Sequence, residues 1–283
     1  MVKNSRVSIE PTGSKIGAIV HNVDLNKEIS HEEKTILQTA LTEFQVIFFE
    51  DQILETAQQK VATKIFGPLL PSETFFDHPD GDPEVEAVIN DENSPPIGTA
   101  IWHSDLTWAS EPPGGTSLYA LKTPVGKGDT IWSSMTAVYD SLSDGMKTYL
   151  NDLTAVHSWD MGFGGREIIF KRGQEIYVNH KSSNPPVEHP VIRTHPLSGR
   201  KLIYVNSTFT SHIVGLPKLE SEGILEFLFG LVTRPENQVR HRWQEGTLAV
   251  WDNTATQHSV VGDFYPEYRE LRRVTFGGHG KPT

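Results

Sequence analysis

The chain has 283 residues, 37% of them hydrophobic, which is enough for a substantial core in one large domain or two average ones. Its 36 acidic and 25 basic residues give a formal net charge of -11, which argues against nucleic acid as the main partner, because phosphate binding needs clustered Lys and Arg. The absence of cysteine excludes disulfides, thiolate zinc sites and cysteine nucleophiles, so any metal must be held by histidine and carboxylate.

The first part of the chain predicts strands at residues 7–9 and 16–20, a helix behind Ser30, a buried strand at 46–49 and a second helix at 55–66. Ser30 and Glu33 have the spacing of a capping box, in which each residue satisfies a free backbone group at the helix start. Gly67 and Pro68 end the second helix.

After residue 68 the sequence consists mainly of short β-rich runs. They lie at residues 117–121, 129–132, 153–158, 189–194, 202–205, 239–243, 248–251 and 271–276, and helical segments at about 136–150 and 219–232 interrupt them. Many short strands with a few helices predict an α+β, mainly β fold: a β-sandwich or jelly roll with flanking helices. The strands are dispersed, which favours a single domain over residues 1–283. Residues 161–186 have little core pattern and predict a long loop, a candidate lid.

A candidate metal-binding pair lies at His103 and Asp105. Side chains two apart on a strand point to the same face, so this pair could aim an imidazole and a carboxylate at one point. One further histidine would complete the two-histidine, one-carboxylate site of non-haem Fe(II) oxygenases. An H-x-D pair is weak evidence in a chain with 12 histidines, so the downstream sequence decides.

The downstream sequence supplies that histidine and a candidate anion clamp. A predicted strand at 248–251 ends in a turn at Asp252 and Asn253, and His258 follows. Arg269 and Arg273 lie beyond it on one face of the next strand, with Arg272 on the opposite face. A 2-oxo acid can supply the electrons that an Fe(II) centre lacks for reducing O₂. Its distal carboxylate needs a cation, and arginine offers a bidentate fork.

These motifs occur together in one order: W-H-x-D at residues 102–105, G-D-T at 128–130, W-D-N-x-x-x-x-H at 251–258 and R-x-x-x-R at 269–273. In this combination the chain resembles the TauD/TfdA family of Fe(II)/2-oxoglutarate-dependent dioxygenases. The opening segments at 16–18 and 23–25 resemble the same family, so the resemblance covers essentially the whole chain. It implies a double-stranded β-helix, or jelly roll, in agreement with the predicted strands.

The resemblance also implies roles for individual residues. The iron ligands fall on His103, Asp105 and His258. The clamp for the 2-oxoglutarate carboxylate falls on Arg269, with Thr130 as its hydroxyl partner. The expected cofactors are therefore Fe(II), 2-oxoglutarate as cosubstrate, and O₂.

Other candidate residues carry more than one interpretation. Arg273 falls where family members that use sulfonates hold the substrate anion, but a structural ion pair is an alternative. Trp108 resembles the aromatic residue of the family's substrate pocket, and core packing explains it equally well. Trp102 and Trp251 are assigned to the core. His157 could face the pocket, although a satisfied core histidine is the simpler interpretation.

The chain departs from the taurine-specialised pattern at three polar positions. Ser72 stands where those members carry a His, Phe75 where they carry a Tyr, and Thr99 where they carry an Asn. A site that hydrogen-bonds its substrate discriminates strongly, so these departures argue against tight taurine recognition. They leave Ser72, Phe75 and Thr99 as expected lining residues of a pocket for a small organic anion.

The predicted function is hydroxylation of a sulfonate or sulfate ester, with release of succinate and CO₂. Two alternatives stay open: the same chemistry on an aryloxyalkanoate, and a non-catalytic jelly-roll protein that binds a metal or ligand. The sequence has neither an apolar signal-peptide core nor an apolar run of about 20 residues, the length of a membrane span. We therefore expect a cytoplasmic protein without a nucleic-acid or membrane partner, and family analogy implies a homodimer or homotetramer.

Overall fold

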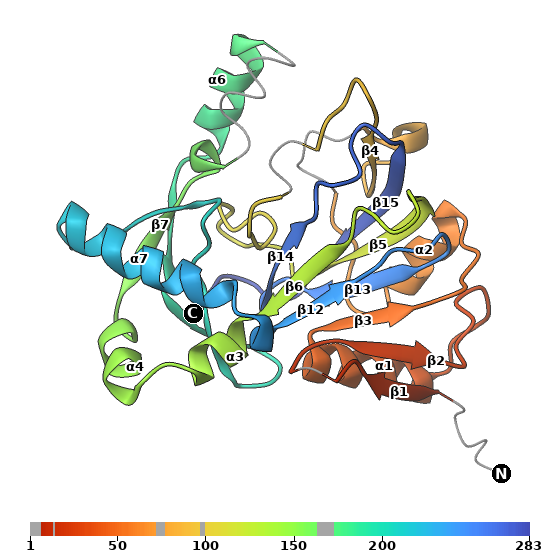
Figure 1. Ribbon diagram of the computed structural model, residues 1–283, viewed down its shortest axis with the longest axis horizontal. Coiled ribbons are helices and arrows are strands. Elements are labelled where there is room, and N and C mark those ends of the chain that lie inside the picture. Colours follow the sequence, from red (N-terminus) through yellow and green to blue (C-terminus); the bar gives the residue numbers. More distant parts are fainter. Residues whose placement is uncertain (1–6, 14, 72–76, 97–99, 163–172) are drawn as a thin grey trace.

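The computed structural model describes residues 7–13, 15–71, 77–96, 100–162 and 173–283 (Figure 1). The strands are β1 (Ser8–Pro11), β2 (Ala18–His21), β3 (Val46–Phe49), β4 (Val85–Asn90), β5 (Gly115–Lys122), β6 (Thr130–Ser134), β7 (Thr154–His157), β8 (Val187–Pro190), β9 (Ile192–Thr194), β10 (Lys201–Ile203), β11 (Thr210–Ile213), β12 (Gln238–His241), β13 (Leu248–Asp252), β14 (Thr256–Val260) and β15 (Arg269–Phe276). The helices are α1 (His31–Phe44), α2 (Thr56–Thr63), α3 (Met135–Asp140), α4 (Asp144–Leu150), α6 (Gln174–Ser183) and α7 (Lys218–Val232), with short 3-10 turns η1 (Pro79–Gly81), η2 (Trp159–Met161) and η3 (Pro235–Asn237).

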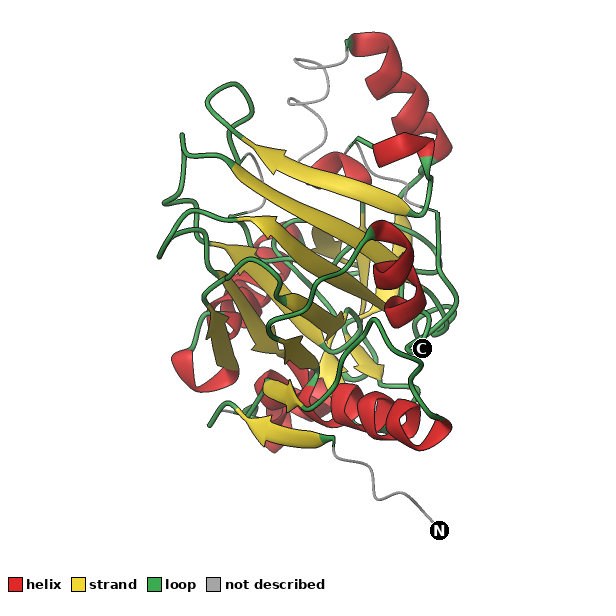
Figure 2. Ribbon diagram, turned by 90° about the vertical axis from the view of Figure 1, so that its right-hand side faces the viewer, coloured by secondary structure: helices red, strands yellow, loops and turns green. Residues whose placement is uncertain are grey.

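The largest sheet has seven strands in the order β1-β2-β3-β13-β5-β15-β4, and only the β2–β3 pair is parallel. Smaller antiparallel sheets have the orders β12-β6-β14, β11-β7-β8 and β10-β9. The strands run across the molecule in Figure 2, and in both views α6 lies at the end opposite β1. The result is a mixed α+β fold in which strands β13 and β14, joined by a short turn, belong to different sheets.

Strands β3 and β13 separate two apolar cores. Phe48 and Trp251 point to one face, where they share a core with Trp132 of the β12-β6-β14 sheet. Phe49 and Val250 point to the other face, which is covered by the apolar side of α1. This alternation is the period-two pattern of a strand buried on both faces, and it explains why residues 46–49 are apolar throughout.

A buried polar contact fixes α2 against β15. Gln59, which is fully buried, donates from Nε2 to the carbonyl oxygen of Arg272 at 2.9 Å and accepts from the Arg272 Nε at 2.7 Å. The Arg272 guanidinium also lies over the Tyr119 ring, 5.3 Å from its centroid. These contacts hold Arg272 on the helix-covered face of the sheet, so the strand's other face is left for Arg269 and Arg273.

Several sequence predictions are confirmed. The helix behind Ser30 is α1, and both hydrogen bonds of the capping box are present. Residues 46–49 form β3, and residues 55–66 contain the shorter helix α2. The segment 136–150 holds two helices, α3 and α4, because Ser143 caps a new helix after a break at residues 141–143.

Three strands, β4, β11 and β14, are absent from the prediction. Each carries polar residues that the fold buries: Glu86 in β4, Thr210 in β11, and Gln257 and His258 in β14. Hydrophobic periodicity therefore does not reveal β11 and β14, whereas β4 is mostly apolar and was overlooked. No helix in the described part of the chain combines the length and apolar character that crossing a membrane requires.

The prediction of a loop over residues 161–186 is wrong for Gln174–Ser183, which form α6. This helix is mostly polar, and side chains from the preceding segment, at Trp159 and Asp160, hold it in place. Lys181 Nζ donates to Asp160 Oδ2 at 2.6 Å, Tyr177 donates to the other oxygen of the same carboxylate, and the His180 ring packs 4.6 Å from the Trp159 ring. Tertiary contacts of this kind leave no apolar stripe for sequence analysis to find.

The capping box of α1 makes a stability prediction. Ser30→Ala removes the oxygen that accepts from the Glu33 backbone N–H at 3.2 Å, so the free energy of unfolding should fall by about 1 kcal/mol in urea denaturation. Ser30→Asp keeps an acceptor and should stay near wild type. Equal losses in the two variants would contradict the role of the cap.

Candidate metal centre and anion sites

A backbone bridge brings the two halves of the candidate metal centre together. His103 N donates to the His258 carbonyl at 3.1 Å, and His258 N donates to the His103 carbonyl at 2.8 Å. The prediction that His103 and Asp105 share a strand is wrong, because only His103 pairs, through this isolated bridge, and the chain then turns through Leu106 with φ of +52°. Asp105 itself is the first residue of a turn, so strand alternation does not explain why its carboxylate faces the imidazoles.

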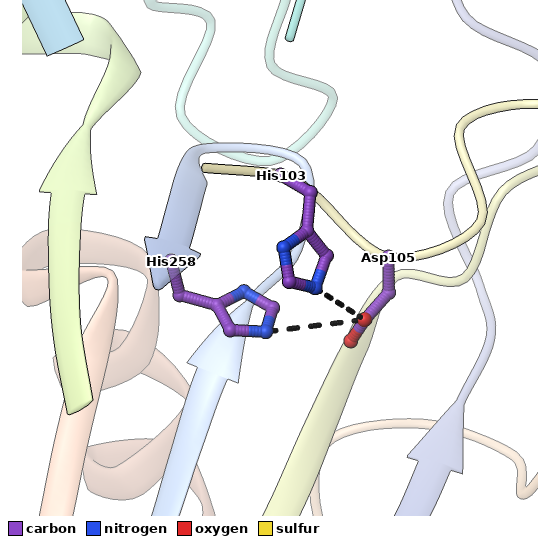
Figure 3. A group of neighbouring side chains, drawn as sticks. All are labelled: His103, Asp105 and His258. Atoms are coloured by element: carbon purple, nitrogen blue, oxygen red, sulfur yellow. Dashed lines mark ion pairs between the residues drawn. The ribbon is translucent and has the colours of Figure 1, made fainter. Parts of the chain in front are cut away.

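The three predicted ligands point to one place (Figure 3). His103 Nε2 lies 3.7 Å and His258 Nε2 lies 3.9 Å from the same oxygen, Asp105 Oδ1. One ligand atom from each residue falls within 4.8 Å of the others, and all three side chains are buried. This donor set of two imidazoles and one carboxylate on one side of a point suits a divalent first-row metal with open positions.

The protonation of the three side chains also suits a cation. His103 Nδ1 lies 2.7 Å from the Ile101 carbonyl, which requires the ring proton on Nδ1 and leaves the Nε2 lone pair facing Asp105. Burial lowers the pKa of His103, and it lowers the pKa of His258 to about 3, so both rings are neutral at pH 7. Burial by itself would raise the pKa of the Asp105 carboxyl, but its charged surroundings, with the Arg273 guanidinium 3.6 Å from Oδ1, lower the pKa below its ordinary value, so Asp105 is charged.

Arg269 is a buried cation near this centre. It is 2% exposed, and its contacts include the Gly128 carbonyl at 3.3 Å from Nη2 and the Phe264 ring at 5.1 Å. Within the described residues no carboxylate pairs with it, and its Nε has no hydrogen-bond partner. Burial lowers its pKa to about 10, which leaves it positive at pH 7. A buried, uncompensated guanidinium is costly unless an anion binds to it.

The G-D-T motif lies against this arginine. A Cβ on Gly128, where φ is +72°, would come 3.1 Å from Arg269 Nε, so a side chain there would be both strained and crowded. The Thr130 hydroxyl is buried and accepts from Trp243 Nε1 at 2.9 Å, which leaves its own hydrogen to donate. The structure thus brings Arg269 into contact with the motif that carries Thr130.

Arg273 has a different environment. Its Nε donates to the buried carboxylate of Glu86 on β4, and its Nη1 lies 3.6 Å from Asp105 Oδ1. The prediction that Arg272 and Arg273 point to opposite faces of the strand is confirmed. Arg273 is paired with Leu118, which belongs to the core around Trp132, while Arg272 is held by Gln59 on the face that α2 covers. The ion-pair interpretation of Arg273 is confirmed by the Glu86 contact, but the same side chain also lines a cavity.

That cavity, of about 510 Å³, lies beside the metal centre. Asp105, Glu111 and Arg273 are its charged lining residues, and Leu70, Leu106, Trp108 and Pro113 contribute apolar lining. Trp108 is only 4% exposed and also packs with Trp159 and Phe209, so it both fills a small core and forms cavity wall. A charged end beside the metal and an apolar body is the arrangement expected for a small amphipathic ligand.

A second cluster of two histidines and one carboxylate, His195, Asp252 and His279, is a poorer metal site. His195 Nδ1 accepts from the Ser198 backbone N–H at 3.0 Å, so the ring proton must be on Nε2, which donates to Asp252 Oδ2 at 2.7 Å. A metal-binding histidine needs the opposite arrangement, with its second ring nitrogen as a donor. The cluster is therefore best described as a buried hydrogen-bonded pair beside His279.

The remaining predicted residues divide into two groups. Ser72, Phe75 and Thr99 lie outside the described residues. His157 is a satisfied core histidine: it is fully buried, its Nδ1 lies 3.1 Å from Thr107 Oγ1, and burial lowers its pKa to about 3. Trp251 is a core residue, as predicted, and the partly buried Trp102 packs against the core.

Sequence analysis overlooked three residues that touch this site. Thr116 Oγ1 donates to Asp105 Oδ2 at 3.1 Å, Glu86 pairs with Arg273, and the Asn253 side chain binds the Asp105 backbone. Glu86 and Thr116 belong to no motif that could have revealed them. Asn253 is part of W-D-N, and its place in that motif was the available signal.

Comparison with known proteins agrees with the geometry. The profile of the "Taurine catabolism dioxygenase TauD, TfdA family" matches residues 8–275. An alpha-ketoglutarate-dependent sulfate ester dioxygenase of Pseudomonas putida is 30% identical over 281 residues, which is 96% of this chain and 90% of the relative. An alpha-ketoglutarate-dependent 2,4-dichlorophenoxyacetate dioxygenase of Cupriavidus pinatubonensis is 29% identical over 290 residues, which is 95% of this chain and 97% of the relative.

A solved structure shows the same fold. The crystal structure of a putative alpha-ketoglutarate-dependent taurine dioxygenase from Burkholderia xenovorans superposes with a TM-score of 0.84 at 31% identity, and the match covers 98% of this chain and 91% of that one. Membership of an enzyme family, together with a complete ligand triad, argues against the non-catalytic alternative. The chain belongs to the TauD/TfdA family of Fe(II)- and 2-oxoglutarate-dependent dioxygenases.

Proposed function

We propose that this enzyme hydroxylates a small organic anion, a sulfonate or sulfate ester, with release of succinate and CO₂, and that His103, Asp105 and His258 hold the iron. The converging Nε2 and Oδ1 atoms and the fixed His103 tautomer support this ligand assignment. Bound iron and 2-oxoglutarate together supply, with O₂, the oxidising power for attack on a C–H bond. The chain itself orients the reactants and excludes water.

Arg269 is proposed to bind the distal carboxylate of 2-oxoglutarate, with Thr130 as a hydroxyl donor. The support is the charge of Arg269, which is buried without a carboxylate partner among the described residues. A cosubstrate dianion would convert this costly cation into a charge-assisted, bidentate pair.

The observation that carries the substrate proposal is the position of Arg273 in the cavity wall, 3.6 Å from Asp105. A substrate anion bound to this guanidinium would be held within reach of the metal centre, with its apolar body against Leu106 and Trp108. Glu86 binds the Nε of Arg273, and the Nη1 of the same guanidinium lies 3.6 Å from Asp105 Oδ1. Because Glu86 also offsets the charge of Arg273, apolar contacts must contribute much of the affinity.

An aryloxyalkanoate is the second candidate substrate. It has the same charged end, and its aromatic ring would suit the wall formed by Trp108, Leu70 and Pro113. The similarity to a dichlorophenoxyacetate dioxygenase over 95% of this chain supports it. The departures at Ser72, Phe75 and Thr99 still disfavour taurine among the sulfonates.

The proposal extends to the architecture around the site. We propose that the seven-stranded sheet and the β12-β6-β14 sheet are the two walls of a double-stranded β-helix within a single domain. The core that they share around Trp132 supports this. We also propose that the segment 161–186 is a lid, an idea supported by Ser183, Asn184 and Pro185 in the cavity lining.

The iron assignment predicts a spectroscopic result. Wild-type protein mixed anaerobically with Fe(II) and 2-oxoglutarate should develop a visible metal-to-ligand charge-transfer band. His258→Ala should lose the band, because one of the three ligands is gone. His212→Ala, which removes an exposed histidine outside the site, should keep it. A band that persists in His258→Ala would contradict the assignment.

The cosubstrate assignment predicts opposite effects on binding and stability. Arg269→Leu should weaken 2-oxoglutarate binding about 10- to 100-fold, the loss expected for charge-assisted hydrogen bonds of about 1.5–3 kcal/mol. The same change removes a buried unpaired charge, so the protein without ligands should melt at the same or a higher temperature. Titration calorimetry and thermal melting measure the two quantities.

Arg272→Leu is the matched control for Arg269→Leu. Arg272 is held by Gln59 on the outer face of the same strand, so its loss should lower the melting temperature and leave 2-oxoglutarate affinity unchanged. The cosubstrate assignment is wrong if Arg269→Leu and Arg272→Leu bind 2-oxoglutarate equally well.

The substrate proposal is tested by succinate release with taurine, longer alkylsulfonates, alkyl sulfates and phenoxyacetates. We expect efficient turnover of an alkyl sulfate or alkylsulfonate and poor turnover of taurine. Preference for phenoxyacetates would favour the second candidate.

The double variant Arg273→Met/Glu86→Gln removes both charges of the pair without stranding either one. Its KM for the anionic substrate should rise about 10- to 100-fold, with the charge-transfer band intact. An unchanged KM on every anion would remove Arg273 from the substrate site.

A further inference from the structure

The turn between β13 and β14 carries a fully buried polar side chain, Asn253. The turn joins a strand of the seven-stranded sheet to the strand that carries His258. A buried carboxamide has four hydrogen-bonding positions, and leaving them unpaired would cost more than an apolar side chain in the same place. The partners of Asn253 therefore indicate what it does.

Asn253 binds both backbone groups of the metal-site carboxylate residue. Its Oδ1 accepts from the Asp105 N–H at 2.6 Å, and its Nδ2 donates to the Asp105 carbonyl at 2.8 Å. The assignment of oxygen and nitrogen is unambiguous, because one side faces an N–H and the other faces carbonyls. The amide thus pairs with Asp105 as a neighbouring strand would, at a point where the described part of the chain supplies no strand neighbour.

The same side chain reaches the far end of the segment that begins at Asp105. Nδ2 also lies 3.3 Å from the Pro113 carbonyl, and the Asn253 backbone N–H donates to the Gly114 carbonyl at 3.0 Å. Between these ends lie Leu106 and Trp108, which line the cavity. Asn253 therefore binds both ends of the segment 105–114, which provides the metal-site carboxylate and much of the cavity wall.

The turn that presents Asn253 is itself held rigidly. Asp252 Oδ1 accepts from the backbone N–H groups of Thr254 at 2.9 Å and Ala255 at 3.1 Å, and Asp252 Oδ2 accepts from His195 at 2.7 Å. The Asp252 backbone N–H donates to the carbonyl of Gln45, which ends α1. The second His–Asp cluster thus has a structural role, since it anchors the turn.

We propose that Asn253 is the positioning residue of the metal centre: its amide holds the Asp105 backbone so that the carboxylate faces the two imidazoles before metal binds. Asp105 leaves the backbone bridge at His103 and enters a turn, so no strand among the described residues fixes its orientation by ladder hydrogen bonds. The amide of Asn253 replaces that ladder. The proposal concerns the metal site alone and does not depend on the identity of the substrate.

The test measures metal affinity without turnover. Apo protein is titrated with Mn(II), and the electron paramagnetic resonance signal of free Mn(II) reports binding. Asn253→Ala removes all the side-chain contacts, and its affinity should fall about 10- to 100-fold, as expected for loss of a group that orients a ligand. Asn253→Asp keeps the volume and the acceptor for the Asp105 N–H but replaces the Nδ2 donor, and should also lose at least about 10-fold.

Asn237→Ala is the matched control. Asn237 is 1% exposed and donates to the Leu231 carbonyl at 3.4 Å, at the end of α7. It should lower the melting temperature of the apo protein and leave Mn(II) affinity at the wild-type value. Wild-type affinity in both Asn253 variants would overturn the proposal, and so would an equal loss of affinity in Asn237→Ala, which would attribute the effect to general destabilisation.

Discussion

The site depends on a junction between two chain segments about 150 residues apart in sequence. His103 and His258 exchange backbone hydrogen bonds, and the Asn253 amide binds the backbone of Asp105. The backbone bridge alone would not fix Asp105, and the Asn253 contact alone would not fix the two histidines relative to each other. Together they fix the positions of three side chains whose Nε2 and Oδ1 atoms converge. The sheets supply the rigid frame, because β13 and β14 are each paired along their length.

The two inward-facing arginines of β15, Arg269 and Arg273, differ in how far nearby carboxylates compensate their charge. This difference underlies the different roles proposed for them. Arg269 is buried without a carboxylate among the described residues, so it gains most from an anion that arrives from outside. Arg273 is already compensated by Glu86 and lies near Asp105, so its gain from an anion is smaller. A cosubstrate that all family members share would suit the first arginine. A substrate that varies between members would suit the second, whose environment a single residue such as Glu86 can adjust.

The sequence alone predicted site residues where the chemistry of the site requires a motif of fixed residue types. The H-x-D pair, the distal histidine and the two arginines could be predicted because metal and anion sites restrict residue type and order. The reason first given for His103 and Asp105, alternation on a strand, was wrong, because Asp105 lies in a turn and not in a strand. Strand β14 was missed because Gln257 and His258 are polar yet buried. Glu86 could not be found, because its partner Arg273 is 187 residues away and only the register of β4 on β15 brings them together.

The central claim concerns where the metal and cosubstrate bind, and a crystal structure with Mn(II) and the 2-oxoglutarate analogue N-oxalylglycine tests it most directly. The account predicts anomalous density for Mn(II) between His103 Nε2, Asp105 Oδ1 and His258 Nε2, with the distal carboxylate of the analogue on Arg269. Mn(II) bound instead by His195, Asp252 and His279, or an analogue that makes no contact with Arg269, would contradict it.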